Sequence, residues 1–332
     1  MNFDSQSGII DKVARLLGHS PHDVNCDLIS SEEAQVWQIN HLIRLNSVTI
    51  EAKVVAWLKR HKSMAKAKRE REAIYAWGKW VGAPKIIANL DEFTLLLEHC
   101  EGLSLSQVGP QAAPSIGSLI AHLHQRPYPD KDTLPLSQAL SMRANHSLKS
   151  LSKICSRIEK DSPLLAERLH DLVMNAGLLF REAEEGIGEV QRVPCHRDLR
   201  TEHLIFNYGK KGALSIKLID WGQSRADHWS SDWVKLWLDP TFEAYFDSAW
   251  DTYWLKMASC FSSTLSREQL KNLTDRSLRQ LHSLATFHVL NTFIWADQMQ
   301  TEVMIGSNNL SKSAIWKRGI DELEVLNKRS LF

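Results

Sequence analysis

Two neighbouring stretches of the chain, VPCHRDLRTEHLIF (193–206) and ALSIKLIDWG (213–222), determine how its fold is interpreted. Each contains a short apolar run typical of a β-strand, and the polar NYGKKG (207–212) between them is turn-like. Asp198 lies beside the first run and Asp220 directly follows the second. A single aspartate in a loop is usually only a turn or cap residue. Two of them, separated by a hairpin-length insert, indicate a shared site.

The residue types around these aspartates fit phosphoryl transfer. That reaction needs one carboxylate to orient the attacking hydroxyl and a second to hold a metal ion on the phosphates. His196-Arg197-Asp198 and Asp220-Trp221-Gly222 are similar to the HRD and DFG elements of kinases. We therefore expect His196, Arg197 and Asp198 to form the catalytic triplet, with Asp198 as its carboxylate, and Asp220 to be the main metal ligand.

Two further segments extend the similarity. With IDWGQSRADHWSSDWVKLW (219–237) and SLIAHLHQRP (118–127), the chain resembles the aminoglycoside phosphotransferase and choline kinase superfamily over nearly its whole length. The resemblance implies an α+β, bilobal protein-kinase-like fold. Its small N-lobe, an antiparallel sheet with one helix, would comprise residues 1–99, and its larger, mainly α C-lobe residues 100–332. Asp232 would have a structural role.

The same resemblance implies an activity. It is the ATP-dependent transfer of the γ-phosphoryl group, with Mg²⁺, to a hydroxyl of a small-molecule acceptor that is aminoglycoside-, sugar- or amino-alcohol-like. Acidic and basic residues are nearly balanced in the last hundred positions, so an aminoglycoside is not specifically favoured.

A strand pair is predicted upstream. The segments 34–45 and 48–61 are rich in Val, Ile and Trp and flank Asn46-Ser47, as antiparallel strands around a tight turn do. A turn centred there places Lys59 opposite Ala34 and Lys53 opposite Asn40.

This register selects a lysine for the nucleotide site. The resemblance implies a strand lysine that contacts the phosphates and a loop that covers them. We assign the loop to residues 30–33, with Ser30 and Ser31 as its phosphate-covering residues, and Lys59 is preferred because it lies beside this loop.

A basic helix is predicted from about residue 63 to 81. Glu70 shares one face with Ile74, Trp77 and Val81, so it should point inward and pair with the strand lysine. The alternative is a solvated helix whose Glu and Lys side chains pair only at the surface. Residues 83–99 predict two more short strands, and the resemblance places the adenine against the backbone from Glu98 to Cys100.

His203 departs from the family pattern, which has a metal-binding asparagine five residues after the catalytic aspartate. Magnesium prefers oxygen ligands, so an imidazole should bind it less well. His203 could hydrogen-bond the phosphate or the catalytic loop while Asp220 holds the metal alone, or the site could favour Mn²⁺. The protein could also be a nucleotide-binding pseudokinase. Finally, the pattern HRDxxxxH resembles the lipopolysaccharide-core and Kdo kinases of Gram-negative bacteria.

Composition limits the partners. The 332 residues include 40 basic and 39 acidic side chains, so no global field favours nucleic acid. The five scattered cysteines form no CxxC pair, which favours a reducing compartment, and no apolar run could span a membrane. We expect a cytoplasmic protein. The basic run 59–71 could contact an anionic membrane, but such a run is more commonly a solvated helix face.

Overall fold

The chain forms two compact units that interleave along the sequence. The computed structural model describes residues 6–30, 34–44, 50–128, 135–187, 192–209, 212–259, 266–303 and 320–321. The first unit comprises residues 1–126, 194–225 and 244–253, and the second comprises residues 127–193, 226–243 and 254–332.

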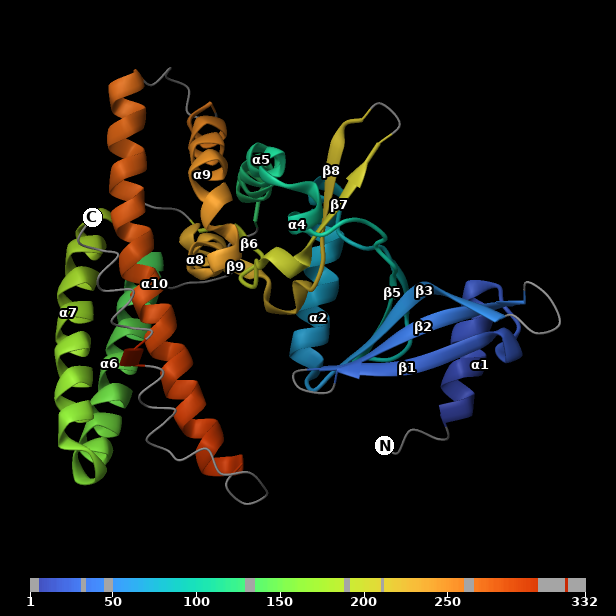
Figure 1. The fold of residues 1–332 in the computed structure, drawn as a ribbon, viewed down its shortest axis with the longest axis horizontal. Helices are drawn as coiled ribbons and strands as arrows, with labels where there is room; N and C mark the ends of the chain where they lie inside the picture. Colours follow the sequence, from blue (N-terminus) through green and yellow to red (C-terminus); the bar gives the residue numbers. More distant parts are fainter. Residues whose placement is uncertain are drawn as a thin grey trace. The chain divides into compact units, whose positions relative to one another are not determined.

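The first unit contains an antiparallel sheet of five strands in the order β1-β2-β3-β5-β4 (Figure 1). Its strands are β1 (Val24–Ser30), β2 (Ala34–Arg44), β3 (Ile50–His61), β4 (Ile86–Asn89) and β5 (Thr94–Glu98). The two predicted strand pairs, β2 with β3 and β4 with β5, are thereby confirmed, as is the α+β fold class. Strand β1 was not predicted. Its apolar alternation covers only three positions, and two poor strand formers interrupt it: Asn25 and Asp27, whose side chains hydrogen-bond to each other.

Strand β3 presents two different faces because successive side chains alternate across a sheet. Ala56 and Leu58 pack with Val13 and Ala14 of α1 (Gln6–Leu17) in one hydrophobic cluster. Lys59 and the other odd-numbered positions near the end of β3 lie on the opposite face, which contacts α2 (Met64–Ala73). One strand therefore supplies both an apolar core and a polar site.

The predicted register between β2 and β3 was wrong. Ala34 pairs with His61, and Lys59 pairs with Val36, two positions from the expected partner. Lys53 pairs with His41 instead of Asn40. A β-bulge beside Ile39 changes the register along the pair, and Asn46-Ser47 lies outside the described residues.

The predicted basic helix is confirmed, with an addition. Ser63 caps α2, since its side chain accepts a hydrogen bond from the backbone N–H of Lys66. A π-helical turn, Ile74–Gly78, continues the helix into α3 (Lys79–Val81), which ends at Gly82 in a left-handed conformation. The remaining elements that belong wholly or mostly to this unit are α4 (Leu105–Val108), α5 (Ala113–His124), β6 (Val193–Cys195), β7 (Leu204–Tyr208), β8 (Leu214–Leu218) and α9 (Glu243–Ala258). Strand β9 (Arg225–Asp227) has its first residue in this unit and the other two in the second.

The second unit is built from helices. They are α6 (Leu136–Asp161), α7 (Pro163–Ile187), α8 (Ser230–Leu238) and α10 (Arg267–Val303). Leu151 and Ile158 of α6, Leu169 of α7 and Leu290 of α10 meet in one buried cluster. Helix α7 begins at Pro163, which fits a helix start because proline is well tolerated in the first turn.

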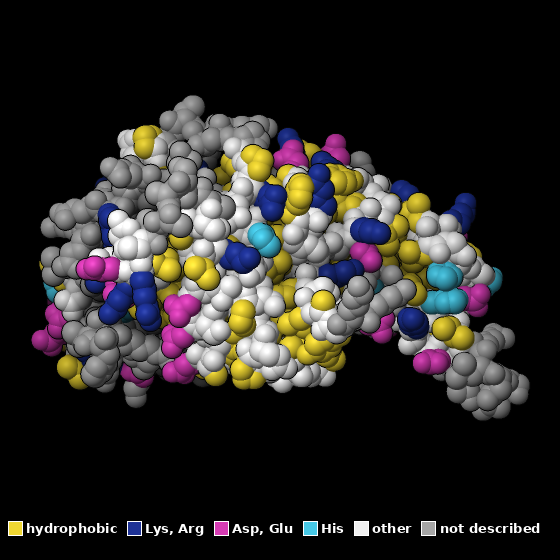
Figure 2. Space-filling view, turned by 90° about the horizontal axis from the view of Figure 1, so that it is seen from above, with side chains coloured by type: hydrophobic (Ala, Val, Ile, Leu, Met, Phe, Trp, Pro, Cys, Tyr) yellow, Lys and Arg dark blue, Asp and Glu magenta, His cyan; other side chains and the backbone are white. Residues whose placement is uncertain are grey.

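On the face shown in Figure 2, Lys and Arg side chains lie scattered among acidic and hydrophobic ones. This mixture agrees with the formal net charge of +1.

A substitution at Gly82 tests how closely the end of α3 approaches β8. The φ of Gly82 is +71°, and a Cβ there would lie 2.5 Å from the carbonyl oxygen of Ile216. Gly18 has a similar φ of +75° with nothing within 4 Å of such a Cβ. We expect Gly18→Ala to lower the free energy of unfolding by about 1 kcal/mol, from backbone strain alone. Gly82→Ala should lower it by about 2 kcal/mol more, because its Cβ would also meet the Ile216 carbonyl oxygen. Urea unfolding measures both losses, and equal losses would contradict this packing.

Candidate active site

Three charged side chains from separate segments of the first unit meet at one point. Lys59 of β3 donates hydrogen bonds from Nζ to Oε1 of Glu70 at 3.2 Å and to Oδ1 of Asp220 at 2.6 Å. Glu70, in α2, is fully buried, whereas the Asp220 side chain is 42% exposed. The ion pair therefore has a closed end at Glu70 and an open end at Asp220.

Glu70 is held by more than the lysine. His61 Nε2 donates to Oε2 of Glu70 at 2.6 Å, and the backbone N–H of Trp221 donates to Oε1 at 3.2 Å. Burial alone would raise the pKa of Glu70, but the Lys59 charge and the His61 hydrogen bond outweigh it and hold the pKa below its usual value. Glu70 is thus a charged carboxylate fixed from three sides.

The pKa of Lys59 moves in the opposite direction. Burial would lower it, but the charges of Glu70 and Asp220 raise it above its ordinary value. Burial likewise acts to raise the pKa of Asp220, and the charge and hydrogen bond of Lys59 outweigh this and lower it strongly. All three groups therefore stay ionised near neutral pH.

The loop that carries the predicted catalytic residues begins after β6 and is tied to the segment that carries Asp220. His196 is fully buried, and its Nε2 donates to the carbonyl oxygen of Ile219 at 2.9 Å. Arg197 has a φ of 64°, in the left-handed region that disfavours side chains. Asp198 follows with its side chain 17% exposed, and Nε of Arg200 donates to its Oδ1 at 3.1 Å.

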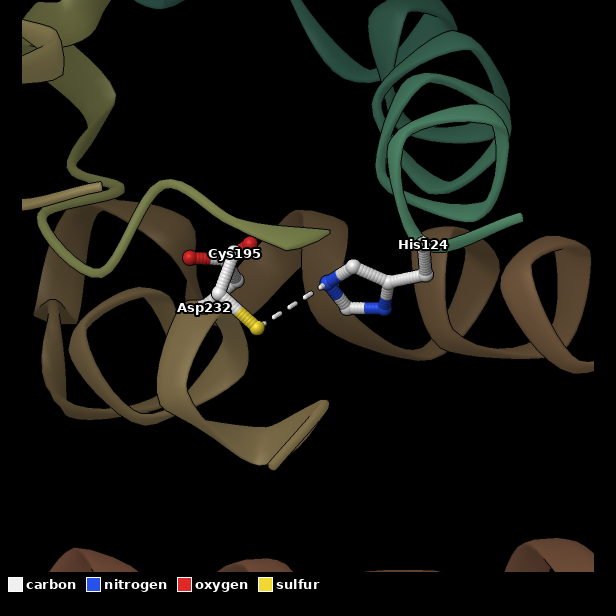
Figure 3. A group of neighbouring side chains, drawn as sticks. All are labelled: His124, Cys195 and Asp232. Atoms are coloured by element: carbon white, nitrogen blue, oxygen red, sulfur yellow. Dashed lines mark hydrogen bonds between the residues drawn. The ribbon is translucent and has the colours of Figure 1, made fainter. Parts of the chain in front are cut away.

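The strand before the loop is anchored by a buried chain of polar contacts. Figure 3 shows the Cys195 thiol pointing toward the ring of His124, at 3.9 Å from Nε2. The other ring nitrogen, Nδ1, lies 2.8 Å from the hydroxyl of Tyr253. Cys195, His124 and Tyr253 come from β6, α5 and α9, so three elements of the first unit fix where the loop starts.

His203 closes the loop onto itself. Its Nδ1 lies 2.6 Å from the carbonyl oxygen of Asp198. One ring nitrogen of His203 and one carboxylate oxygen each of Asp198 and Asp220 lie within 4.8 Å of one another. These side chains could share a cation after small adjustments.

A cleft of about 250 Å³ connects these groups. Of the residues proposed from the sequence, it is lined by Lys59, Asp198, His203 and Asp220. It is also lined by charged or titratable side chains that the sequence analysis did not assign to the site, namely His61, Lys66, Arg200 and Glu202. The signal for His61 was its position two residues after Lys59, which puts both on one face of the strand.

The remaining predicted site residues either do not line this cleft or lie outside the part of the chain that the structure describes. Ser31 is outside the described residues, and of Ser30 only the backbone, at the end of β1, is described. Glu98 and Cys100 are not among the residues that line the cleft: Glu98 accepts a hydrogen bond from Lys217 at 3.2 Å, and Cys100 is buried. Asp232 is fully buried in the first turn of α8, in the second unit. The proposed roles of these five residues stay predictions.

The sequence places this chain in a known family. Residues 47–260, more than half of the chain, match the model described as the phosphotransferase enzyme family, and the protein belongs to that family. It is accordingly a phosphotransferase. A search of curated protein sequences gives no significant match.

Solved structures support the same fold at low sequence identity. A Plasmodium vivax ethanolamine kinase is 14% identical with a TM-score of 0.59, over 98% of this chain and 89% of that one. A choline kinase from Cryptosporidium parvum is 13% identical with a TM-score of 0.59, over 98% and 96%. The ADP-bound aminoglycoside phosphotransferase APH(2'')-Ib is 9% identical with a TM-score of 0.59, over 98% and 99%. The chain therefore has the bilobal kinase-like fold.

No helix within the described part of the chain is both long and apolar enough to cross a lipid bilayer.

Glu70→Gln tests the buried ion pair. The variant leaves Lys59 with Asp220 as its carboxylate partner. We therefore expect the free energy of unfolding to fall by about 2 kcal/mol, which is less than the usual cost of breaking a buried ion pair. Because the pKa of Glu70 is lowered on folding, its contribution is complete above the ordinary value of 4.5 and is lost as the pH falls through the folded-state pKa. The stability difference from the unmodified protein should therefore shrink below pH 4.5.

Urea unfolding at several pH values measures this difference. Glu72→Gln is the matched control, since Glu72 lies on the same helix with 63% of its side chain exposed. A loss from Glu72→Gln as large as that from Glu70→Gln would refute the assignment.

Proposed function

We propose that the protein transfers the γ-phosphoryl group of ATP to a hydroxyl of a small acceptor, with Asp198 as the catalytic carboxylate. The observation that carries the proposal is the single cleft that brings together Lys59, Asp198, His203 and Asp220. A cation for phosphate, a carboxylate for the hydroxyl and ligands for a metal ion are the parts that this reaction requires.

Asp198 would act on the acceptor. Its carboxylate borders the cleft and can accept a hydrogen bond from the attacking hydroxyl and then its proton. Arg200, which donates to one oxygen of Asp198, would keep the carboxylate oriented. His196 and Arg197 would act as positioning residues, because the buried His196 ring ties the loop to Ile219.

Lys59 would contact the nucleotide phosphates. Its Nζ is placed by Glu70, which is itself fixed by His61, so the ammonium needs little further ordering on binding. The covering residues Ser30 and Ser31, and the backbone from Glu98 to Cys100 as the adenine contact, complete the proposed nucleotide site. The ADP-bound structure of a similar phosphotransferase supports a nucleotide donor.

The donor set fits a divalent cation. Two carboxylates and an imidazole converge, and Asp220 remains ionised. Asp220 would hold Mg²⁺ or Mn²⁺ together with His203, and the bound cation would neutralise charge on the phosphates. Asp232 would support this arrangement structurally.

The acceptor is proposed as a small amino-alcohol-like or sugar-like compound. Similar structures are named as kinases of ethanolamine and choline and as aminoglycoside phosphotransferases.

We further propose a nucleotide-binding lobe in residues 1–99, an acceptor-binding lobe in 100–332, and a cytoplasmic location. The near-neutral net charge supports a small-molecule partner over nucleic acid.

Asp198→Asn tests the catalytic assignment. Removing the proton acceptor should lower kcat by about a thousandfold while ATP binding persists. Turnover is measured against ethanolamine, choline, aminoglycosides, sugars and core lipopolysaccharide, and calorimetry follows nucleotide binding. Undiminished kcat in the variant would refute the role of Asp198. Turnover confined to core lipopolysaccharide would instead identify a saccharide kinase of the lipopolysaccharide type.

Lys59→Met tests the phosphate contact, with Lys53→Met as the control on the same strand. Lys53 is exposed and Lys59 is buried. We expect the affinity for ADP to fall at least about tenfold in Lys59→Met, the equivalent of one charge-assisted hydrogen bond, and to stay unchanged in Lys53→Met. Thermal unfolding verifies that both variants are folded. Equal ADP affinities of the two variants would exclude Lys59 as the phosphate ligand.

A further inference from the structure

The proton on His203 can be assigned from its hydrogen bond. Nδ1 lies 2.6 Å from the backbone carbonyl oxygen of Asp198. A carbonyl oxygen can only accept, so Nδ1 carries the hydrogen and donates it. In the neutral imidazole the second nitrogen, Nε2, then keeps its lone pair and is the nitrogen left to bind a cation.

The surroundings of His203 supply the other ligands. Its ring lines the same cleft as Asp198 and Asp220, and one potential ligand atom from each of the three lies within 4.8 Å of the others. The Asp220 side chain is 42% exposed, so a cation can approach it from the cleft. The donor set is therefore two carboxylates and one nitrogen.

A nitrogen in this set changes which metal fits. Mg²⁺ prefers six oxygen ligands and gives up its water reluctantly, whereas divalent ions of the first transition row accept imidazole readily. A carbonyl that accepts from the far nitrogen fixes the tautomer, orients the ring and makes the coordinating nitrogen more basic. The Asp198 carbonyl has this position relative to His203.

We propose that Nε2 of His203 and the carboxylate of Asp220 form a metal site that selects Mn²⁺ over Mg²⁺. The inference rests on the proposed function in that it concerns the cation of the same cleft. The new element is that a histidine nitrogen, Nε2 of His203, binds the cation directly. The alternative is that His203 only fastens the catalytic loop and all protein ligands are oxygen atoms.

Electron paramagnetic resonance of the full-length protein with Mn²⁺ alone distinguishes the two. Titration gives the Mn²⁺ affinity, competition with Mg²⁺ gives the preference, and pulsed measurement detects a ¹⁴N nucleus bound directly to Mn²⁺. We expect bound Mn²⁺ with a nitrogen coupling that changes to the ¹⁵N pattern when histidine is ¹⁵N-labelled.

Two variants locate the nitrogen. His203→Asn should abolish the coupling and shift the Mn²⁺-to-Mg²⁺ preference at least about tenfold toward Mg²⁺. His41→Asn is the matched control, because it removes an imidazole from the stacked His19–His41 pair, outside the cleft. It should leave both the coupling and the preference unchanged.

Four results would overturn the proposal: no Mn²⁺ binding, bound Mn²⁺ without nitrogen coupling, a coupling that survives in His203→Asn, or equal affinities for the two metals. The labelling experiment needs no variant, so even if His203→Asn does not fold it establishes whether a histidine nitrogen binds the metal; among the described residues that line the cleft, the histidines are His61 and His203. None of these readouts involves turnover. Failure of the proposed function would appear separately, as absence of turnover with every acceptor tested or as undiminished kcat in Asp198→Asn.

Discussion

The first unit depends on a buried ammonium group shared between two carboxylates. Lys59 is nearly enclosed, and neither it nor Glu70 could remain charged there alone, because removing an isolated ion from water costs several kcal/mol. Each group needs the others at hydrogen-bonding distance. Since Lys59, Glu70 and Asp220 come from β3, α2 and the loop after β8, this one requirement fixes three segments relative to one another within the unit.

This arrangement contributes more to position than to net stability. A buried ion pair gains little over a well-packed apolar substitute, but it has only one acceptable geometry. Here that geometry is reinforced at Glu70, where His61 and the Trp221 backbone N–H occupy the carboxylate oxygens together with Lys59. The open end of the network is Asp220, which faces the cleft. The buried side thus supplies rigidity, and the accessible side keeps a charged group for a ligand.

The sequence predicted the strands and the helix of this unit better than it predicted the register in which strands β2 and β3 pair. Periodicity alone indicated that Glu70 points inward with Ile74 and Trp77, and all three are buried. Lys59 was chosen over Lys53 by a register that is wrong by one position at Lys53 and, beyond the bulge beside Ile39, by two positions at Lys59. The bulge accounts for the second of these two positions, and it adds a residue without a distinctive sequence pattern, so a local pattern could not show it.

The contacts that complete the site were less predictable. The proximity of His61 to Glu70, and of His203 Nδ1 to the Asp198 carbonyl, depends on how separate segments fold together.

Among the described residues, the two non-glycine residues with positive φ are Arg197 and Asp220. Each such conformation costs on the order of 1–3 kcal/mol and persists only where surrounding contacts enforce it. The His196–Ile219 hydrogen bond joins the neighbours of both, and Lys59 holds Asp220 directly. Strain in the two loops that carry the proposed catalytic and metal-binding carboxylates is therefore maintained by the same buried contacts that place them, which argues that these loops are shaped for chemistry rather than for stability.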